Sequence, residues 1–274
     1  MDSLSLIDTW PVDNAAVAVV SKDGSVLGTR GDQDRQFALA SVTKLLTASA
    51  ILLAVEEGAL ELDDEAGPEG STIRHLLAHA SGLDFSEDVV RGRPGQRRIY
   101  SNLGIEVLAQ TFAERADMPF EEYLREGLLE PLGMHSTRLD GSPAAGGVST
   151  AADLSRFAAE LQNPKVLHAE TIAQATQVVF PGIDGVLPGY GRQRPNDWGL
   201  GFEIRDSKTP HWTGNANSPQ TFGHFGQAGT FLWVDPVAGL ACVGLADRNF
   251  GEWSAEVWPP LSDAVLAEYS RTNS

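Results

Sequence analysis

The sequence predicts one central helix, Ala40-Ser41-Val42-Thr43-Lys44-Leu45-Leu46-Thr47-Ala48-Ser49-Ala50-Ile51-Leu52-Leu53-Ala54-Val55. If this stretch forms a helix, its side chains are apolar on nearly every face after the first turn. A helix without a polar face is expected to be buried in the middle of a domain. Glu56, Glu57 and Gly58 mark its expected end. The rest of the chain is therefore expected to pack around this helix.

Ser41 and Lys44 stand three residues apart in the expected first turn. That spacing places both side chains on one face of a helix, close enough for a hydrogen bond. A serine hydroxyl needs a nearby base to become a nucleophile. Free N–H groups at a helix N-terminus also favour negative charge near Ser41. The pair therefore indicates a nucleophile beside its base.

Composition limits the class of protein. The chain has 274 residues, of which 42% are hydrophobic, so it can bury a substantial core. A formal charge of −17 argues against binding to nucleic acid or to an anionic membrane surface. The single cysteine, Cys242, lies in an apolar run, where a buried small hydrophobic residue is expected and no disulfide can form within one chain.

The first residues, Met1 to Asp8, carry acidic side chains where a signal peptide has basic ones, and no apolar run approaches the length of a membrane span. These features predict a cytoplasmic protein with no membrane partner. The sequence does not determine the oligomeric state.

The pattern along the chain predicts an α/β protein of the α+β type. Strands and a closing helix are expected near the two ends, at 15–20, 25–30, 198–205, 230–235, 240–246 and 260–270. Helices are expected between them, at 71–79, 103–116 and 119–129. We therefore predict an antiparallel sheet built from both termini and flanked by helices. Residues 1–61 plus 197–274 would form the sheet-and-helix domain, 62–196 an inserted helical domain, and the active site would lie at their interface.

Two further motifs are expected to converge on Ser41. Tyr100-Ser101-Asn102 stands at the entry of the helix expected from Leu103. His224-Phe225-Gly226-Gln227 precedes a strand expected near Gly229, and its glycine allows a close backbone approach.

Taken in order, Ser41-x-x-Lys44, Tyr100-Ser101-Asn102 and His224-Phe225-Gly226 resemble the three motifs of the serine β-lactamase and penicillin-binding-protein superfamily. The pattern is most similar to class C β-lactamases, DD-carboxypeptidases and family VIII esterases. Other segments also resemble sequences of this family: Leu76 to Leu83, Pro131 to Met134, Gly146 to Thr150 and Trp198 to Phe202. The resemblance implies a β-lactamase/transpeptidase-like fold and acyl transfer through an acyl-enzyme, without a cofactor.

The resemblance also implies roles for the site residues. Lys44 and Tyr100 together would take the proton of Ser41, and the sequence leaves open which of them is the base. Tyr100 would return the proton to the leaving group and activate the deacylating water, while Asn102 would hold Lys44 and the substrate. His224 and Gly226 would belong to the substrate-binding motif, and the N–H groups of Ser41 and Gln227 would form the oxyanion hole.

No metal site is expected. His75 and His79 have the i, i+4 spacing of a helical zinc site. The Glu that a zinc protease carries after the first His is replaced by Leu76, and no third ligand stands nearby.

The third motif departs from the family pattern because Phe225 stands where β-lactamases and some carboxypeptidases have Thr. Without that hydroxyl, a substrate carboxylate would be poorly paired. The leading interpretation is therefore a serine hydrolase, an esterase, that acts on a small-molecule ester or amide. A DD-carboxypeptidase or β-lactamase is the alternative with the same fold. A non-catalytic binding or sensor protein is the alternative of another class, and an intact Ser41, Lys44 and Tyr100 set counts against it.

Overall fold

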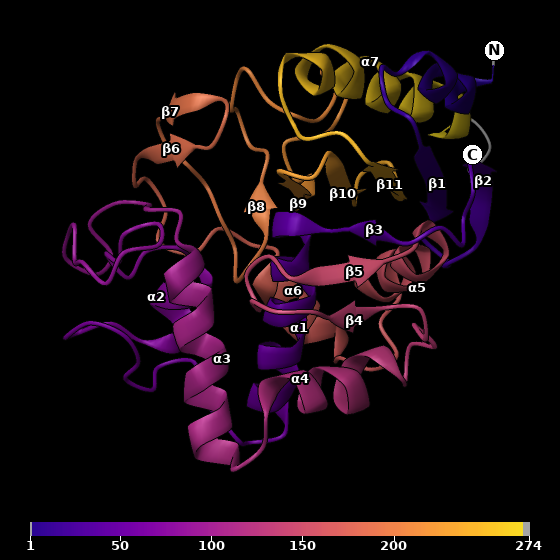
Figure 1. Cartoon of the computed structure of the whole chain (residues 1–274). Helices are drawn as coiled ribbons and strands as arrows, with labels where there is room; N and C mark the ends of the chain where they lie inside the picture. The colour runs from indigo at the N-terminus through magenta and orange to yellow at the C-terminus, as the bar shows by residue number, and fades with distance from the viewer. Residues whose placement is uncertain (1, 271–274) are drawn as a thin grey trace.

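The computed structural model describes residues 2–270. Its main sheet has six antiparallel strands in the order β2-β1-β11-β10-β9-β8 (Figure 1). Their bounds are β1 Ala15–Ser21, β2 Val26–Arg30, β8 Glu203–Ile204, β9 Phe222–Gly226, β10 Thr230–Asp235 and β11 Leu240–Ala246. β1 from the N-terminal part pairs with β11 from the C-terminal part, which confirms the predicted sheet built from both ends.

The two faces of the sheet are covered by different layers. Successive strand residues point to opposite faces, so Val17 and Val19 join one apolar cluster and Ala16 and Ala18 the other. The first face is covered by η1 (Ser3–Thr9) and α7 (Glu252–Tyr269). The second is covered by α5 (Ala151–Gln162), and α1 (Thr43–Glu56) lies on the same side (Figure 1). The sheet is thus buried on both faces.

The central helix is buried as predicted. Every residue of α1 from Thr43 to Ala54 is buried. It contacts α3 (Asn102–Ala116), the π-helical turn η3 (Leu124–Leu129) and β9. Ser41 lies just outside α1, in a 3-10 turn, η2 (Ala40–Val42), that runs into it. The nucleophile candidate therefore sits at the entry of the helix rather than in its first α-helical turn.

Shorter elements complete the fold. A second sheet has the order β3-β5-β4, and β6 and β7 form a hairpin. The bounds are β3 Phe37–Ala38, β4 Arg138–Leu139, β5 Gly147–Ser149, β6 Gly185–Leu187, β7 Gly191–Gln193, α2 Ile73–Leu77, α4 Phe120–Tyr123 and α6 Ala169–Ala175.

The predicted inserted segment, 62–196, contributes α2, α3 and α4, but it also contains α5. Thr150 caps α5 by accepting a hydrogen bond from the N–H of Asp153 at 3.1 Å. The apolar side of this helix, which includes Leu154 and Phe157, packs against β1, β10 and β11. The division into 1–61 plus 197–274 and 62–196 stays a proposal, and a boundary drawn there separates α5 from the sheet on which it packs.

The third motif precedes a strand as predicted, because β10 begins at Thr230, but it also lies within a strand of its own that was not predicted. His224, Phe225 and Gly226 belong to β9, between β8 and β10. The segment Phe222-Gly223-His224-Phe225-Gly226 carries two glycines, which weaken the local strand signal. Pairing with β10 overrides that weakness, because each residue of β9 lies opposite a residue from Thr230 to Val234.

Two other predicted bounds differ from the structure. Only Glu203 and Ile204 of the strand expected at 198–205 are extended in the sheet, because Gly201 turns the chain at a φ of 88°. The closing helix begins at Glu252, well before the predicted start at residue 260. It continues through Pro259 and Pro260, and its buried residues include Trp258 and Leu261 on either side of them. Packing on the sheet here outweighs the disruption that proline causes inside a helix.

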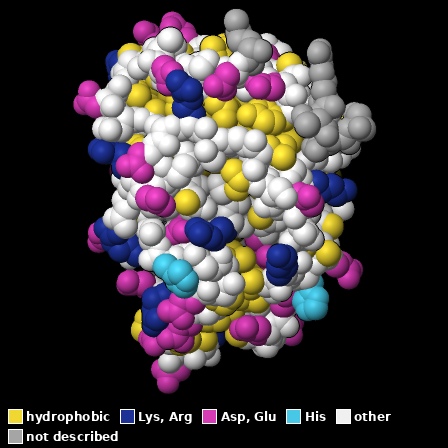
Figure 2. All heavy atoms as spheres, turned by 90° about the vertical axis from the view of Figure 1, so that its right-hand side faces the viewer, with side chains coloured by type: hydrophobic (Ala, Val, Ile, Leu, Met, Phe, Trp, Pro, Cys, Tyr) yellow, Lys and Arg dark blue, Asp and Glu magenta, His cyan; other side chains and the backbone are white. Residues whose placement is uncertain are grey.

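The surface fits the composition. On the face turned toward the viewer in Figure 2, basic side chains lie scattered among acidic ones without forming a basic patch. Among residues 2–270, no helix has the length and hydropathy needed to cross a bilayer. The cytoplasmic location stays a prediction.

Candidate active site

The backbone around Ser41 is held in an unusual conformation. Ala40, the preceding residue, has a positive φ of 45°, which is uncommon for a residue other than glycine. The carbonyl of Leu39 accepts a hydrogen bond from the Thr230 hydroxyl at 2.8 Å, which ties this turn to β10. A Cβ atom on Gly226 would collide with the same carbonyl oxygen, so only glycine fits there. The turn that carries Ser41 is thus pressed directly against the end of β9.

Lys44 is fully buried among neutral partners. Its Nζ lies 3.1 Å from Ser41 Oγ, 2.6 Å from Asn102 Oδ1 and 2.9 Å from the carbonyl oxygen of Ala144. Burial disfavours the charged amine and lowers the pKa of Lys44 to about 7, although the more distant charge of Glu106 opposes this shift. A substantial fraction of Lys44 is therefore neutral near pH 7.

The arrangement around Lys44 suits a base. A neutral amine has two N–H donors and one lone pair. Asn102 Oδ1 and the Ala144 carbonyl can only accept, so they take the two donors. The lone pair then faces Ser41 Oγ and can accept its proton.

Tyr100 approaches Ser41 from the other motif. Its hydroxyl lies 2.7 Å from Ser41 Oγ and 3.2 Å from His224 Nε2. Burial raises the pKa of Tyr100 well above its usual value, although the hydrogen bond to Ser41 opposes this, so the resting side chain is a protonated phenol. The next residue, Ser101, caps α3 through the N–H of Gly104 at 2.9 Å. This cap places Asn102 at the first position of α3, facing Lys44.

His224 is a neutral hydrogen-bond acceptor in this site. Its Nδ1 lies 2.6 Å from the carbonyl oxygen of Phe225, which can only accept, so Nδ1 carries the proton. The lone pair of Nε2 therefore faces the Tyr100 hydroxyl. Burial, reinforced by the charge of Lys44, lowers the pKa of His224 to about 3. His224 thus brings no positive charge to the site at neutral pH.

A small pocket of about 160 Å³ opens beside Ser41. Its lining residues are Ser41, Phe85, Tyr100, Leu187, Pro188, Trp198, Glu203, His224, Phe225 and Gln227. In the described part of the chain, the N–H groups of Ser41 and Gln227 donate to no protein acceptor. Two free donors in the same pocket as the nucleophile have the composition of an oxyanion hole.

The seven predicted site residues are brought together. Hydrogen bonds connect five of them: Ser41, Lys44, Tyr100, Asn102 and His224. Gly226 lies against the backbone before Ser41, and Gln227 lines the pocket. His75 and His79 do not share a helix, because α2 ends at Leu77.

The sequence analysis missed several residues of this site. Trp198 lies against Tyr100 and His224, with ring centroids 5.8 and 5.4 Å apart. Phe85 lies over Tyr100 at 6.0 Å. The carbonyl of Ala144 could not have been identified from the sequence, because a backbone acceptor carries no residue-type signal.

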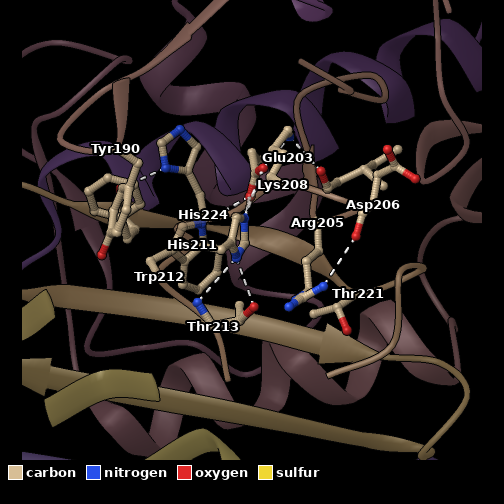
Figure 3. Close-up of polar contacts among 12 residues, drawn as sticks. Tyr190, Glu203, Arg205, Asp206, Lys208, His211, Trp212, Thr213, Thr221 and His224 are labelled. Carbon is tan, nitrogen blue, oxygen red and sulfur yellow. Dashed lines mark hydrogen bonds and ion pairs between the residues drawn. The ribbon is translucent and has the colours of Figure 1, made fainter. Parts of the chain in front are cut away.

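Glu203 is the least expected member of the pocket. Its carboxylate accepts hydrogen bonds from Trp212 Nε1 at 2.9 Å and His211 Nε2 at 3.0 Å, and it forms an ion pair with Lys208. Figure 3 shows these side chains gathered around Glu203, with His224 close by. Burial would raise the pKa of Glu203, but His211 and Lys208 outweigh that effect and hold it well below its usual value. The sequence did contain a hint of this cluster: Lys208, which pairs with Glu203, is one of only four lysines in the chain.

Comparison with known proteins gives matches over most of the chain. A family model described as Beta-lactamase matches residues 12–267. The crystal structure of a β-lactamase from Mycobacterium bovis is 57% identical to this chain. It aligns with a TM-score of 0.96 over 98% of this chain and 99% of that one.

Curated relatives match over shorter stretches. Penicillin-binding protein 4* of Bacillus subtilis is 30% identical over an alignment of 136 positions that covers 38% of this chain and 30% of the relative. D-alanyl-D-alanine-carboxypeptidase/endopeptidase AmpH of Escherichia coli is 24% identical over 42% of this chain and 39% of the relative. The matched stretch thus spans well under half of these relatives. The structure of EstCE1, a hydrolase with promiscuous acyltransferase activity, is 19% identical with a TM-score of 0.79 over 96% of each chain, and shows the shared fold.

Proposed function

Because this chain belongs to the β-lactamase family of serine hydrolases, we propose that it hydrolyses neutral carboxylic esters through an acyl-enzyme on Ser41. The choice of esters over β-lactams or D-amino-acid peptides rests on the charge of the catalytic pocket. Substrates of the latter kinds carry a carboxylate close to the bond that is cleaved, and a buried carboxylate requires a paired donor or cation.

One observation carries the proposal. Among the described residues, the only ionised side chain that lines the catalytic pocket is Glu203, which is negative. His224 is neutral, and Phe225 offers no hydrogen-bond donor from its side chain. A carboxylate in this pocket would find no cationic side chain among the described lining residues, because the one charge there is Glu203, which Lys208 already pairs. A neutral ester avoids that cost.

Acylation follows from the contacts of Ser41. The Ser41 oxygen attacks the ester carbonyl carbon while its proton passes to the lone pair of Lys44 at 3.1 Å. The carbonyl oxygen becomes negative and is stabilised by the N–H groups of Ser41 and Gln227. As the bond to the alcohol breaks, the Tyr100 hydroxyl, 2.7 Å from Ser41 Oγ, gives its proton to the leaving oxygen, and the proton held by Lys44 replaces it.

Deacylation reverses these roles with water as the nucleophile. The Lys44 and Tyr100 unit takes a proton from the water as its oxygen attacks the acyl carbon. The bond to Ser41 breaks, and the serine oxygen recovers its proton. His224 Nε2 accepts from the Tyr100 hydroxyl at 3.2 Å and thereby holds the phenol between the two steps.

A comparison of substrates tests the proposal. We expect kcat/KM for a short-chain p-nitrophenyl ester to exceed that for nitrocefin at least about 100-fold, a difference of about 2.7 kcal/mol in transition-state binding. Equal rates for the two substrates would reject the esterase assignment.

β-Lactamase activity is the second candidate. It is favoured by the M. bovis structure, which is described as a β-lactamase and is 57% identical to this chain.

The pair of variants Phe225→Thr and Phe225→Val separates the two candidate functions further. Both variants remove a ring that packs 4.9 Å from Phe250, so they create the same cavity, and only Thr adds a hydroxyl. We expect Phe225→Thr, but not Phe225→Val, to reduce the ratio of kcat/KM for the ester to kcat/KM for nitrocefin.

A non-catalytic protein of this fold is tested by covalent labelling. We expect a fluorophosphonate to modify the chain once, at Ser41, because the lone pair of Lys44 activates that hydroxyl. Mass spectrometry of a peptide digest locates the adduct. An unlabelled protein, or an adduct on another serine, would contradict the assignment of the nucleophile.

A further inference from the structure

A second, larger cavity adjoins the catalytic pocket. It has a volume of about 860 Å³ and shares Phe85, Tyr100 and Pro188 with the smaller pocket. Its walls are the segment 91–100 and the segment 182–192, which contains the β6–β7 turn. We call this cavity the lateral groove. The shared residues place the lateral groove directly beside the pocket that holds Ser41.

The groove is held open by the buried residue Arg98. Its guanidinium donates to backbone carbonyls of Ala78 at 2.6 Å, Asn196 at 3.0 Å and Val179 at 2.8 Å. Its own N–H donates to the carbonyl of Asp184 at 2.8 Å, which joins the two walls. The groove is therefore part of the packed structure, and its walls are fixed by internal hydrogen bonds.

The groove is positive in a strongly negative protein. Four arginines line it, Arg91, Arg97, Arg98 and Arg192, against the single carboxylate of Asp184. Arg91 is paired with Asp84 at 2.7 Å and with Glu87 at 3.4 Å, and Arg192 shares Asp184 with Arg194. Arg97 differs from these, because no carboxylate within residues 2–270 pairs with it and it donates only to the carbonyl of Arg91. With a net charge of −17 on the whole chain, this local excess is specific to the groove.

Two exposed apolar side chains also line the groove. Val186 is 58% exposed, and Phe85, which the groove shares with the catalytic pocket, is 47% exposed. Exposed large apolar side chains and a cationic side chain in the lining of one cavity match a ligand with both characters.

We propose that the lateral groove binds the remote part of an ester substrate that carries an apolar chain ending in an anionic group. The chain would lie along Phe85 and Val186, and its terminal carboxylate, sulfate or phosphate would pair with Arg97. This inference rests on the proposed esterase function for the identity of the reacting bond. It is consistent with the lack of a cationic side chain among the described lining residues of the catalytic pocket, because the negative charge sits at the far end of the substrate.

Binding is tested on the full-length Ser41→Ala variant, so that turnover does not interfere. Titration calorimetry compares n-octyl sulfate, below its critical micelle concentration, with neutral n-octyl glucoside. We expect the sulfate to bind at least about tenfold more tightly, and its affinity to fall at high salt, because the pair with Arg97 is exposed to solvent. Equal affinities for the two ligands would overturn the proposal.

Matched variants locate the binding. Arg97→Gln should weaken octyl sulfate binding about fivefold, the loss of one exposed ion pair. Arg93→Gln, in the same segment but outside the groove lining, should leave it unchanged. Val186→Asp should weaken binding about tenfold through a lost apolar contact and a like charge, whereas Val237→Asp, at another exposed valine, should not. Identical behaviour within either pair would overturn the proposal.

The esterase proposal and the proposal for the lateral groove can fail separately. Ester hydrolysis by the wild-type protein without selective sulfate binding in Ser41→Ala would reject the groove assignment and leave the esterase proposal intact. Selective sulfate binding that depends on Arg97, in a protein that hydrolyses no ester, would retain the anion-binding groove and reject the reaction.

Discussion

Two buried lysines lie close to the catalytic pocket and have opposite environments. Lys44 contacts a hydroxyl, an amide oxygen and a carbonyl, all of them neutral. Lys208 contacts the Glu203 carboxylate and also donates to the carbonyl of Asp197 at 2.6 Å. Both residues are almost completely buried, at 0% and 3% exposure, so burial alone does not distinguish them.

The partner decides what each lysine can do. Without a counterion, burial lowers the pKa of Lys44 to about 7, and the neutral amine becomes available as a base. Burial also lowers the pKa of Lys208, but the Glu203 carboxylate opposes that effect, and Lys208 is half of an ion pair whose partner stays ionised. A buried lysine is therefore evidence for catalysis only where its neighbours are neutral.

Replacing each lysine separately by methionine, which has a similar shape, should show most clearly that the two residues have different roles. For Lys44→Met we expect kcat/KM for a p-nitrophenyl ester to fall about 10⁴-fold, about 5.4 kcal/mol, because the base is lost. Steady-state kinetics measures this, and circular dichroism checks the fold. A Lys44→Met protein that is folded and still active would show that Tyr100 or another group is the base.

Lys208→Met should act on stability instead. It leaves the Glu203 carboxylate buried without its ammonium partner, which we expect to cost about 3 to 5 kcal/mol in the free energy of unfolding. Urea denaturation measures that cost. The fraction that stays folded should keep kcat within about tenfold of the wild type.

The double variant Lys208→Met with Glu203→Gln is the control. Removing both charges should recover part of the loss, because no unpaired buried charge remains. If the double variant is less stable than Lys208→Met alone, the ion pair is not the source of the effect.

The smallest expected effect is in the pH profile. Only neutral Lys44 accepts the Ser41 proton, so kcat/KM should rise about tenfold per pH unit below pH 7 and level off above it. This direction follows from a pKa of about 7 for an amine that acts as a base. His224, with a pKa of about 3, should add no step between pH 5 and 9. A profile that falls as the pH rises through 7 would require a protonated Lys44.

Several features of the fold were predictable from sequence because they are local. The apolar run after Lys44 identified the buried helix, and β10 and β11 begin and end at the predicted bounds, 230–235 and 240–246. The spacing of Ser41 and Lys44 indicated a nucleophile beside its base, and the resemblance of the three motifs, in order, to the β-lactamase superfamily implied the other members of the set of five that hydrogen bonds connect. These signals depend on neighbours within a few positions, which the sequence shows directly.

The remaining features depend on contacts between distant segments, and only the tertiary structure decided them. β9 is a strand because β10 pairs with it, although its two glycines weaken the local preference. Lys44 has a lowered pKa because distant segments of the chain bury it, and the partners that they supply, Asn102 and Ala144, offer neutral oxygens and no carboxylate. Glu203 lines the pocket because Lys208, His211 and Trp212 fold back over it. Residue types and their spacing therefore determined the nucleophile and its partners, whereas the charge of each buried group was set by which distant atoms removed water from it.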